Sequence, residues 1–176
     1  MKLKIKSLVG MVPLLVLCAA IQLHAGESKP NSLETLQAQA ARGDAGAQAV
    51  LGSRYAMGLG VKKDHTEAVR LYRMAAAQGN ATGQCGLGVC FARGEGVAKD
   101  DVEAASWFRK AADQDNPDAQ TKLGGIYMKG EGVKQDAAQA AEWFRKAAAQ
   151  GYAEGQYNLG VCYVMGQGVA QDPVEA

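Results

Sequence analysis

The chain has 176 residues, which is long enough for one domain with a real hydrophobic core. Alanine and glycine are abundant and aromatic residues make up only 6% of the chain, which favours closely packed helices over a bulky β core. The net charge of +1 at pH 7 gives no electrostatic reason to expect nucleic acid or anionic lipid as a partner.

Residues 1–25 are predicted to form a signal peptide. Lysines within the first six residues precede an apolar run from Leu8 to Leu23, and Ala25 offers the small residue that signal peptidase requires. Cleavage there leaves a slightly acidic mature chain, which we expect to be periplasmic or secreted. An uncleaved membrane anchor is the alternative, because the run is at the short edge of a bilayer span. The bulky Leu17 disfavours attachment of lipid to Cys18.

The rest of the chain is organised by an internal repeat. It matches itself at an offset of 36 residues from residue 43 onward, which is the signature of a repeat protein. Residues 26–42 precede the repeats and are predicted to form a short leader and a capping helix from Ser32 to Arg42. The predicted copies are residues 43–78, 79–114, 115–150 and 151–176, the last of them incomplete.

Each copy carries the pattern of two amphipathic helices, of about fourteen residues each, joined by a tight loop. In the first helix Leu51 and Tyr55 share one face, and Gly52 between them lets a neighbouring helix approach closely. The second helix has an apolar stripe made of Ala68, Leu71, Tyr72 and Ala75. One such pair cannot bury its own stripe, so we expect an all-α solenoid of stacked helix-loop-helix repeats.

The helix ends are also encoded in the repeat. Four aspartates each have a Glu or Gln three residues further along the chain, namely Asp64, Asp100, Asp136 and Asp172. This is a capping box, in which the aspartate accepts from backbone N–H groups and the Glu or Gln side chain binds the N–H of the capping residue in return. Preceding helices are predicted to end in a left-handed residue, which is Gly43, Gly79, Asp115 or Gly151.

The loop "KGEGVKQD" resembles a glycine-rich phosphate loop, but we interpret it as a hinge. A related loop occurs in every copy, no Gly-Lys pair is present, and the third glycine of a dinucleotide site is missing. We expect Gly130 to end the first helix and Gly132 to permit the turn. Val133 then packs into the hairpin, and the variable residues Glu131 and Lys134 face solvent.

The repeated columns resemble those of the Sel-1-like repeat family, a tetratricopeptide-like helical hairpin. The likeness covers Gly43 to Ala176 and is carried by segments such as "AQAVLGSRYAMGLGVKKDHTEAVRLYRMAAAQG". The resemblance implies a right-handed superhelix that serves as a scaffold for partner proteins, and it implies no catalytic residues. The fourth copy stops before its second core aromatic position, so we expect the sequence to be part of a longer protein.

Cysteine pairing distinguishes this chain from a secreted branch of that family, which staples each hairpin with a disulfide. The mature part holds only Cys85, Cys90 and Cys162. Cys85 and Cys90 lie about 8 Å apart on one helix, whereas a disulfide needs Cα atoms within about 7 Å. We expect small, half-buried thiols, and pairing with cysteines beyond this chain stays open.

The residue pattern predicts no catalytic, cofactor or metal site. His65 is the single histidine after the signal peptide, and we expect it to be exposed on a helix, with too few ligands for zinc. The cysteine-rich branch has been linked to β-lactam binding or hydrolysis, which is the least favoured alternative because no Ser-x-x-Lys is present. In the two Trp-Phe-Arg-Lys segments, residues 107–110 and 143–146, we expect core aromatics with the basic residues on the opposite, wet side.

If the copies stack as the resemblance implies, the first helices line the concave surface. Positions opposite the leucine-aromatic face vary between copies, such as Ala49, Ser53 and Met57 in the first copy. A binding surface would vary in this way, and so would unconstrained solvent positions. The candidate partner-binding groove consists of Met57, Val89, Arg93, Lys129, Tyr157, Val161 and Met165. It suits an extended or helical peptide that carries an acidic group.

The function predicted from these observations is a non-enzymatic protein-protein interaction scaffold or adaptor of the bacterial cell envelope. Its partner is expected to be a protein or peptide, with no nucleic acid, metal or cofactor involved, and with membrane contact only if the N-terminal segment is uncleaved. The alternative is a periplasmic immunity or inhibitor protein that blocks one toxin or hydrolase, a role that some exported relatives play.

Overall fold

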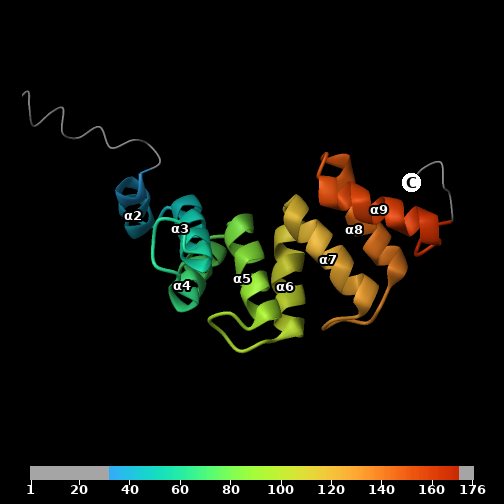
Figure 1. Cartoon of the computed structure of the whole chain (residues 1–176), viewed down its shortest axis with the longest axis horizontal. Coiled ribbons are helices and arrows are strands. Elements are labelled where there is room, and N and C mark those ends of the chain that lie inside the picture. The colour runs from blue at the N-terminus through green and yellow to red at the C-terminus, as the bar shows by residue number, and fades with distance from the viewer. Residues whose placement is uncertain (1–31, 171–176) are drawn as a thin grey trace, which may run out of the picture. The chain divides into compact units, whose positions relative to one another are not determined.

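The computed structural model describes residues 32–170 (Figure 1). Within that range every regular element is a helix, and the elements are α2 Leu33–Ala41, α3 Ala45–Met57, α4 His65–Ala77, α5 Ala81–Arg93, α6 Asp101–Ala112, α7 Pro117–Lys129, α8 Ala137–Ala149 and α9 Ala153–Met165. None of these helices is long and apolar enough to cross a membrane. The predicted signal peptide, the predicted leader and the predicted cap at Asp172 lie outside the described residues.

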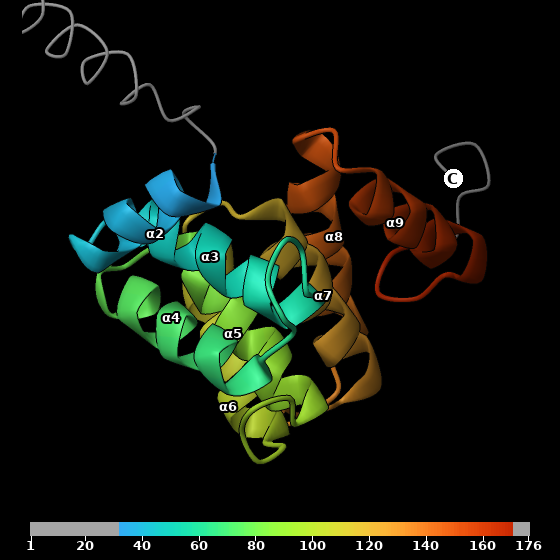
Figure 2. The ribbon, with the colours of Figure 1, turned by 60° about the vertical axis from the view of Figure 1, so that its left-hand side comes forward.

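The helices from α3 onward form consecutive pairs in one compact unit. The first helices α3, α5, α7 and α9 begin at Ala45, Ala81, Pro117 and Ala153, at the spacing of the sequence repeat. Each helix packs mainly against the helices before and after it in the chain, as both views show for α5 between α4 and α6 (Figures 1 and 2). The predicted all-α solenoid of stacked helix-loop-helix repeats is confirmed.

The buried core residues recur at the spacing of the sequence repeat. Leu51, Leu87 and Leu123 are buried at matching positions in α3, α5 and α7. Beside Leu123, Gly124 lies against the ring of Phe144, and a Cβ on this glycine would lie 2.6 Å from a ring carbon. The glycine is therefore required by the close approach of the second helix, as the sequence predicted.

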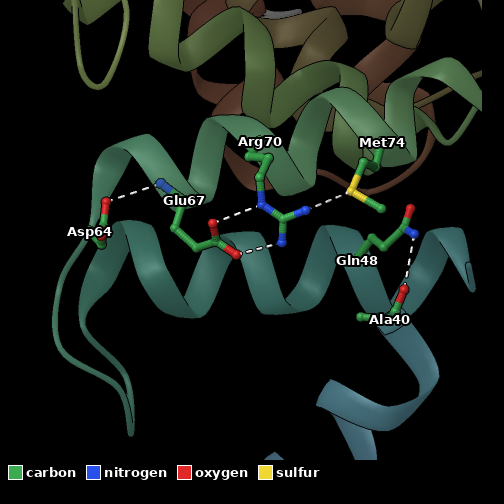
Figure 3. A network of polar contacts seen from close by, with 6 residues as sticks. All are labelled: Ala40, Gln48, Asp64, Glu67, Arg70 and Met74. Atoms are coloured by element: carbon green, nitrogen blue, oxygen red, sulfur yellow. Dashed lines mark hydrogen bonds and ion pairs between the residues drawn. The ribbon is translucent and has the colours of Figure 1, made fainter. Parts of the chain in front are cut away.

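The second helices begin at aspartate caps, but the predicted capping box forms only in part. The Asp136 side chain accepts from the Gln139 backbone N–H at 3.0 Å, and Asp64 does the same with Glu67 (Figure 3). The reciprocal bond is absent from these caps, because the backbone N–H of Asp136 donates instead to the Tyr127 carbonyl at 2.9 Å. This bond fastens the start of the second helix to the first helix, which leaves the Glu67 side chain to pair with Arg70.

The loop between paired helices also joins neighbouring repeats. Gly130 ends α7 with φ +76° and Gly132 forms the turn with φ +69°, as predicted. Gly132 additionally lies on the main-chain carbonyl of Asp101, the first residue of α6 in the preceding repeat, where any Cβ would overlap it. Val133 packs against a core cluster that includes Phe108 and Leu123, while Lys134 is exposed. The second loop glycine therefore has a packing role that the sequence did not show.

In each of the first three repeats a buried glutamine of the first helix pairs with an exposed glutamine at the end of the second helix, a contact that the sequence pattern had not predicted. Gln120 is fully buried, and its Oε1 accepts from the Gln150 side chain at 2.9 Å. Its own amide donates to the Ala112 carbonyl at the end of the preceding repeat. Equivalent pairs join Gln48 to Gln78 and Gln84 to Gln114. The fixed glutamine column in the sequence was the signal that would have revealed them.

Candidate partner-binding face

Three cavities open along the first helices, and together they are lined by all seven residues of the predicted groove. The first cavity, of about 540 Å³, is lined by Met57, Val89 and Arg93 among others. The second cavity, of about 430 Å³, shares Val89 and Arg93 and adds Lys129. Because two residues line both, the first and second cavities form a continuous surface, which we call the first-helix face.

The remaining predicted residues lie apart from that surface. Tyr157, Val161 and Met165 line the third cavity, of about 270 Å³, on α9 alone. Tyr157 and Met165 are 72% and 63% exposed. The structure therefore gathers four of the predicted groove residues on the first-helix face and places the other three in a separate apolar patch.

Some positions expected opposite the core are buried instead. Ala49, Cys85 and Thr121 stand at one repeat position and are 1%, 4% and 3% exposed. The helix period alone had assigned them to the concave surface, but the stacking of the next repeat covers this flank of each first helix. The open positions lie further round the helix, as at Gly125, where an added Cβ would meet nothing within 4 Å.

The first cavity combines apolar and charged groups from several elements. Met57 at the end of α3 and Val89 in α5 supply apolar surface, and Arg93 ends α5. Lys63 comes from the loop before α4, and Glu95 from the loop after α5. Lys63 and Glu95 were not among the predicted groove residues, because a helix pattern does not place side chains that come from loops.

Of the charged side chains that line this cavity, Asp118 forms a close ion pair and the cations Lys63 and Arg93 form none in the described part of the chain. The Asp118 carboxylate accepts from Lys122 Nζ at 3.0 Å, and Glu95 Oε2 lies 3.7 Å from His65 Nδ1. Within residues 32–170, no ion pair forms at Lys63 or Arg93, and both side chains are exposed. The first cavity therefore presents two basic groups without a protein counter-charge.

His65 differs from the expectation of an exposed helix residue. Its side chain is only 27% exposed and lines the first cavity, and its Nδ1 atom is buried with no hydrogen-bond partner in the described part of the chain. The loop of the next repeat explains this burial, since Gly96 lies directly on the His65 carbonyl. A buried ring nitrogen of this kind is a candidate for a polar contact with a bound molecule.

Asp118 connects three successive repeats beside the first cavity. Its carboxylate accepts from Cys85 Sγ in α5 and from the Tyr152 hydroxyl ahead of α9, both at 3.2 Å, in addition to Lys122. Burial, and secondly the charge of Asp118, raise the pKa of the Cys85 thiol above its usual range. The thiol therefore stays protonated and serves as a donor, and is not poised as a nucleophile.

The cysteines are unpaired, as predicted, but more deeply buried than expected. Cys85, Cys90 and Cys162 are free, and none is more than 4% exposed. Burial raises the pKa of Cys90 to about 11. Within residues 32–170 no three His, Cys, Asp or Glu side chains come together where a metal ion could bind.

The second cavity is more evenly charged. Lys122, Lys129 and Arg93 line it together with Glu131 and Glu154. Lys129 Nζ lies 3.7 Å from Glu131 Oε1, and both side chains are well exposed, so this pair is weak and screened by salt. Lys129 therefore has an acidic neighbour in this cavity, whereas Arg93 forms no ion pair within residues 32–170.

In the Trp-Phe-Arg-Lys segments Lys110, Arg145 and Lys146 are exposed, as predicted, whereas Arg109 is half-buried against aromatic rings. The Arg109 guanidinium lies 5.5 Å from the ring centre of Tyr127 and 5.1 Å from that of Trp143, and it donates to the Tyr127 hydroxyl. Lys110 and Lys146 stack over Trp107 and Trp143. Long basic side chains can cover neighbouring aromatic rings while their charged ends reach water.

Comparison with known proteins places these features in a family context. The family model described as the Sel1 repeat matches residues 45–80, 81–116, 117–152 and 153–176. The Escherichia coli protein c5321, a protective antigen present in uropathogenic strains and displaying an SLR fold, is 43% identical over 82% of this chain and 31% of its own, with a TM-score of 0.76. A Sel1 repeat protein from Oxalobacter formigenes is 34% identical over 89% of this chain and 64% of its own, with a TM-score of 0.72.

A more distant solved structure shares the fold alone. It is cysteine rich protein B of Helicobacter pylori, which is 20% identical over 72% of this chain and 96% of its own, with a TM-score of 0.57. A search of the curated proteins found no match. The chain spans less than two thirds of the length of the Escherichia coli and Oxalobacter formigenes proteins.

Proposed function

The chain belongs to the Sel1 repeat family, and from that membership we propose that it is a non-enzymatic scaffold that binds a partner protein on the first-helix face. Proteins built from Sel1 repeats are generally protein-protein interaction scaffolds. A scaffold needs a constant frame and a variable surface. The leucine, glycine and glutamine columns supply the frame, and the residues that line the first and second cavities supply the surface.

The observation that carries this proposal is the position of the cavities. They open between successive repeats rather than within one repeat, and they share Val89 and Arg93. A partner that lies across them therefore contacts several repeats at once. Extended and helical segments both bind in grooves of this kind, because alternate side chains can enter separate pockets.

We also propose that the protein acts outside the cytoplasm, in the cell envelope of a bacterium. The support is the sequence of residues 1–25, with its basic start, apolar run and small residue at Ala25. The Escherichia coli relative is described as a protective antigen. An exported location for this chain agrees with that description. Detection of a mature N-terminus near Gly26 in the periplasmic fraction would support it, and an intact N-terminus in the cytoplasm would contradict it.

Site-specific photo-crosslinking tests the binding face. Benzoylphenylalanine replaces Met57 on the first-helix face. The matched control replaces Val102 on α6, because the two native side chains are similarly exposed, at 61% and 65%. We expect one or a few defined adducts from position 57 and none of these from position 102. Equal adducts from both positions would contradict the proposal. A single partner captured in equimolar amount would favour the inhibitor alternative over a general scaffold.

A substitution inside the face provides the second test. Gly125→Arg places a bulky side chain in the second cavity, where an added Cβ meets nothing within 4 Å. We therefore expect a folded protein that loses the adduct formed from Met57. Val102→Arg is the control and should keep that adduct. If Gly125→Arg folds normally and leaves the adduct unchanged, the partner does not bind along this face.

A further inference from the structure

We propose that the first cavity anchors a carboxylate of the bound partner, held by Lys63 and Arg93, with apolar residues beside it in contact with Met57 and Val89. The proposal rests on the function proposed above and specifies the chemistry that one part of the face recognises. The carboxylate belongs either to an Asp or Glu side chain or to the end of the partner chain, since both present the same group.

The first cavity carries two cations without an ion pair in the described part of the chain. Lys63 and Arg93 reach it from different elements and have no ion pair within residues 32–170. Glu95, on the loop after α5, lies 3.7 Å from His65. Asp118 already pairs with Lys122 and accepts hydrogen bonds from one thiol and one hydroxyl group. An arriving carboxylate thus meets two cations that no internal acid occupies. Hydrogen bonds between such charged groups are about twice as strong as neutral ones.

A buried polar atom without a partner in the described residues lies in the same cavity. His65 Nδ1 has no hydrogen-bond partner in the described part of the chain and lies 3.7 Å from Glu95, beyond hydrogen-bond distance. Unsatisfied buried polar atoms are rare in native proteins and call for an explanation. A bound partner supplies one, because His65 lines the same cavity and its buried ring nitrogen is available to a polar group of that partner.

Apolar surface lies beside these charges in the first cavity. Met57 is 61% exposed and Val89 is half-buried at the wall of the same cavity. A volume of about 540 Å³ lies within the range of about 300–1,000 Å³ that is usual for ligand pockets. A small free anion would bind to the two cations without contacting this apolar surface. A polypeptide that carries an apolar side chain next to its carboxylate fits both features.

Peptide selection provides a direct test. Two libraries of random dodecapeptides, one displayed with a blocked C-terminus and one with a free C-terminus, are selected against the protein lacking residues 1–25. Enrichment of Asp or Glu next to an apolar residue in the blocked library assigns the side chain as the source. Enrichment that is confined to the free-terminus library, and is lost on amidation of the synthetic peptide, assigns the chain end. Absence of enrichment for an acidic group in both libraries would overturn the proposal.

Fluorescence anisotropy with the selected peptide then tests the residues. We expect Lys63→Gln and Arg93→Gln each to weaken binding about tenfold, because each removes a charge-assisted contact. Lys62→Gln is the matched control, since Lys62 is also exposed but does not line the cavity, and it should leave affinity unchanged. Equal losses of affinity in Lys62→Gln and Lys63→Gln would show that Lys63 acts only through the overall charge of the protein, and this would contradict the proposal.

The outcome can be separated from that of the broader function. If Met57 captures a partner in the crosslinking experiment and Gly125→Arg abolishes capture, the binding face stands. Should Lys63→Gln and Arg93→Gln then leave capture and peptide affinity unchanged, only the carboxylate anchor fails. Thermal melting of each variant verifies folding, and we expect no shift because neither cation has an ion pair to lose in residues 32–170.

Discussion

Gly132 in the third repeat lies directly on the main-chain carbonyl of Asp101 in the second repeat. The same relationship joins Gly96 to His65, so it recurs at the junction between repeats. The loop that connects the two helices of one repeat is thus also a contact with the repeat before it. A substitution at this glycine should affect the stacking of repeats as well as the turn.

We predict that Gly132→Ala lowers the free energy of unfolding by at least about 2 kcal/mol. The left-handed backbone at φ +69° costs about 1–2 kcal/mol for a residue with a Cβ, and the overlap with the Asp101 carbonyl adds to this. Gly60→Ala is the matched control, because Gly60 has φ +74° but only a distant contact, 3.8 Å from an Arg54 nitrogen. Urea denaturation measures both.

The comparison isolates the contact between repeats from the turn itself. We expect Gly60→Ala to show the backbone cost alone, and Gly132→Ala to exceed it clearly. Equal losses in the two variants would show that the approach to Asp101 contributes nothing. Lys134→Ala, in the same loop but exposed, should change stability within about 0.5 kcal/mol.

The sequence predicted those parts of the molecule that depend on neighbours along the chain. Helix periodicity, the aspartate caps and the left-handed residues, including Asp115 at φ +59°, follow from local chemistry and are confirmed. The predictions from sequence were wrong where the environment of a side chain depends on another repeat. Cys85 had been placed by the face of its own helix and His65 by the exposure of its column. The adjoining repeat buries Cys85 and leaves the His65 side chain only 27% exposed.

The candidate site divides in the same way. Met57, Val89 and Arg93 were predicted from variation between copies, and the structure brings them to one cavity. Whether they bind a partner stays a prediction. The contribution of Lys63 could not be read from a helix pattern, because it comes from a loop whose position depends on the stacking of two repeats.

The glutamine pairs lead to the second prediction. Gln120→Leu keeps the size of the side chain but removes its amide, leaving the Gln150 side chain and the Ala112 carbonyl without this buried partner. We expect a loss of about 1–3 kcal/mol in the free energy of unfolding. Gln156→Leu is the control at the same repeat position, where the side chain is exposed, and it should change stability little. Similar losses in both variants would indicate a general effect of the added apolar side chain instead.

Arg109 supports the third prediction, which concerns the packing of one second helix on the next repeat. Arg109→Gln removes a guanidinium that lies over the rings of Tyr127 and Trp143, each contact contributing about 0.5–1 kcal/mol. We therefore expect a loss of about 1–2 kcal/mol, measured by urea denaturation. Arg145→Gln changes the same repeat position in the next copy, where the side chain is exposed, and should have little effect. A loss at position 109 no larger than at position 145 would contradict a structural role for the cation-aromatic contacts.

The buried thiols make stability depend on pH in the alkaline range. Burial raises the pKa of Cys90 from its ordinary value of 9.0 to about 11, so the folded protein holds this proton more tightly than the unfolded chain. The resulting stability is fully present below pH 9 and is lost as the pH rises toward 11. We expect the free energy of unfolding of Cys90→Ala to fall less between pH 8 and pH 10.5 than that of the native protein, by about 1–2 kcal/mol. Urea denaturation at both pH values measures this difference, which is independent of the cost of the substitution itself. Tyr72, whose pKa is raised chiefly by burial and to a smaller extent by the charge at Cys90, titrates in both proteins, so the measured difference includes the interaction between the two groups. An equal fall in the two proteins would show that the thiol at position 90 ionises as freely in the folded state as in the unfolded chain.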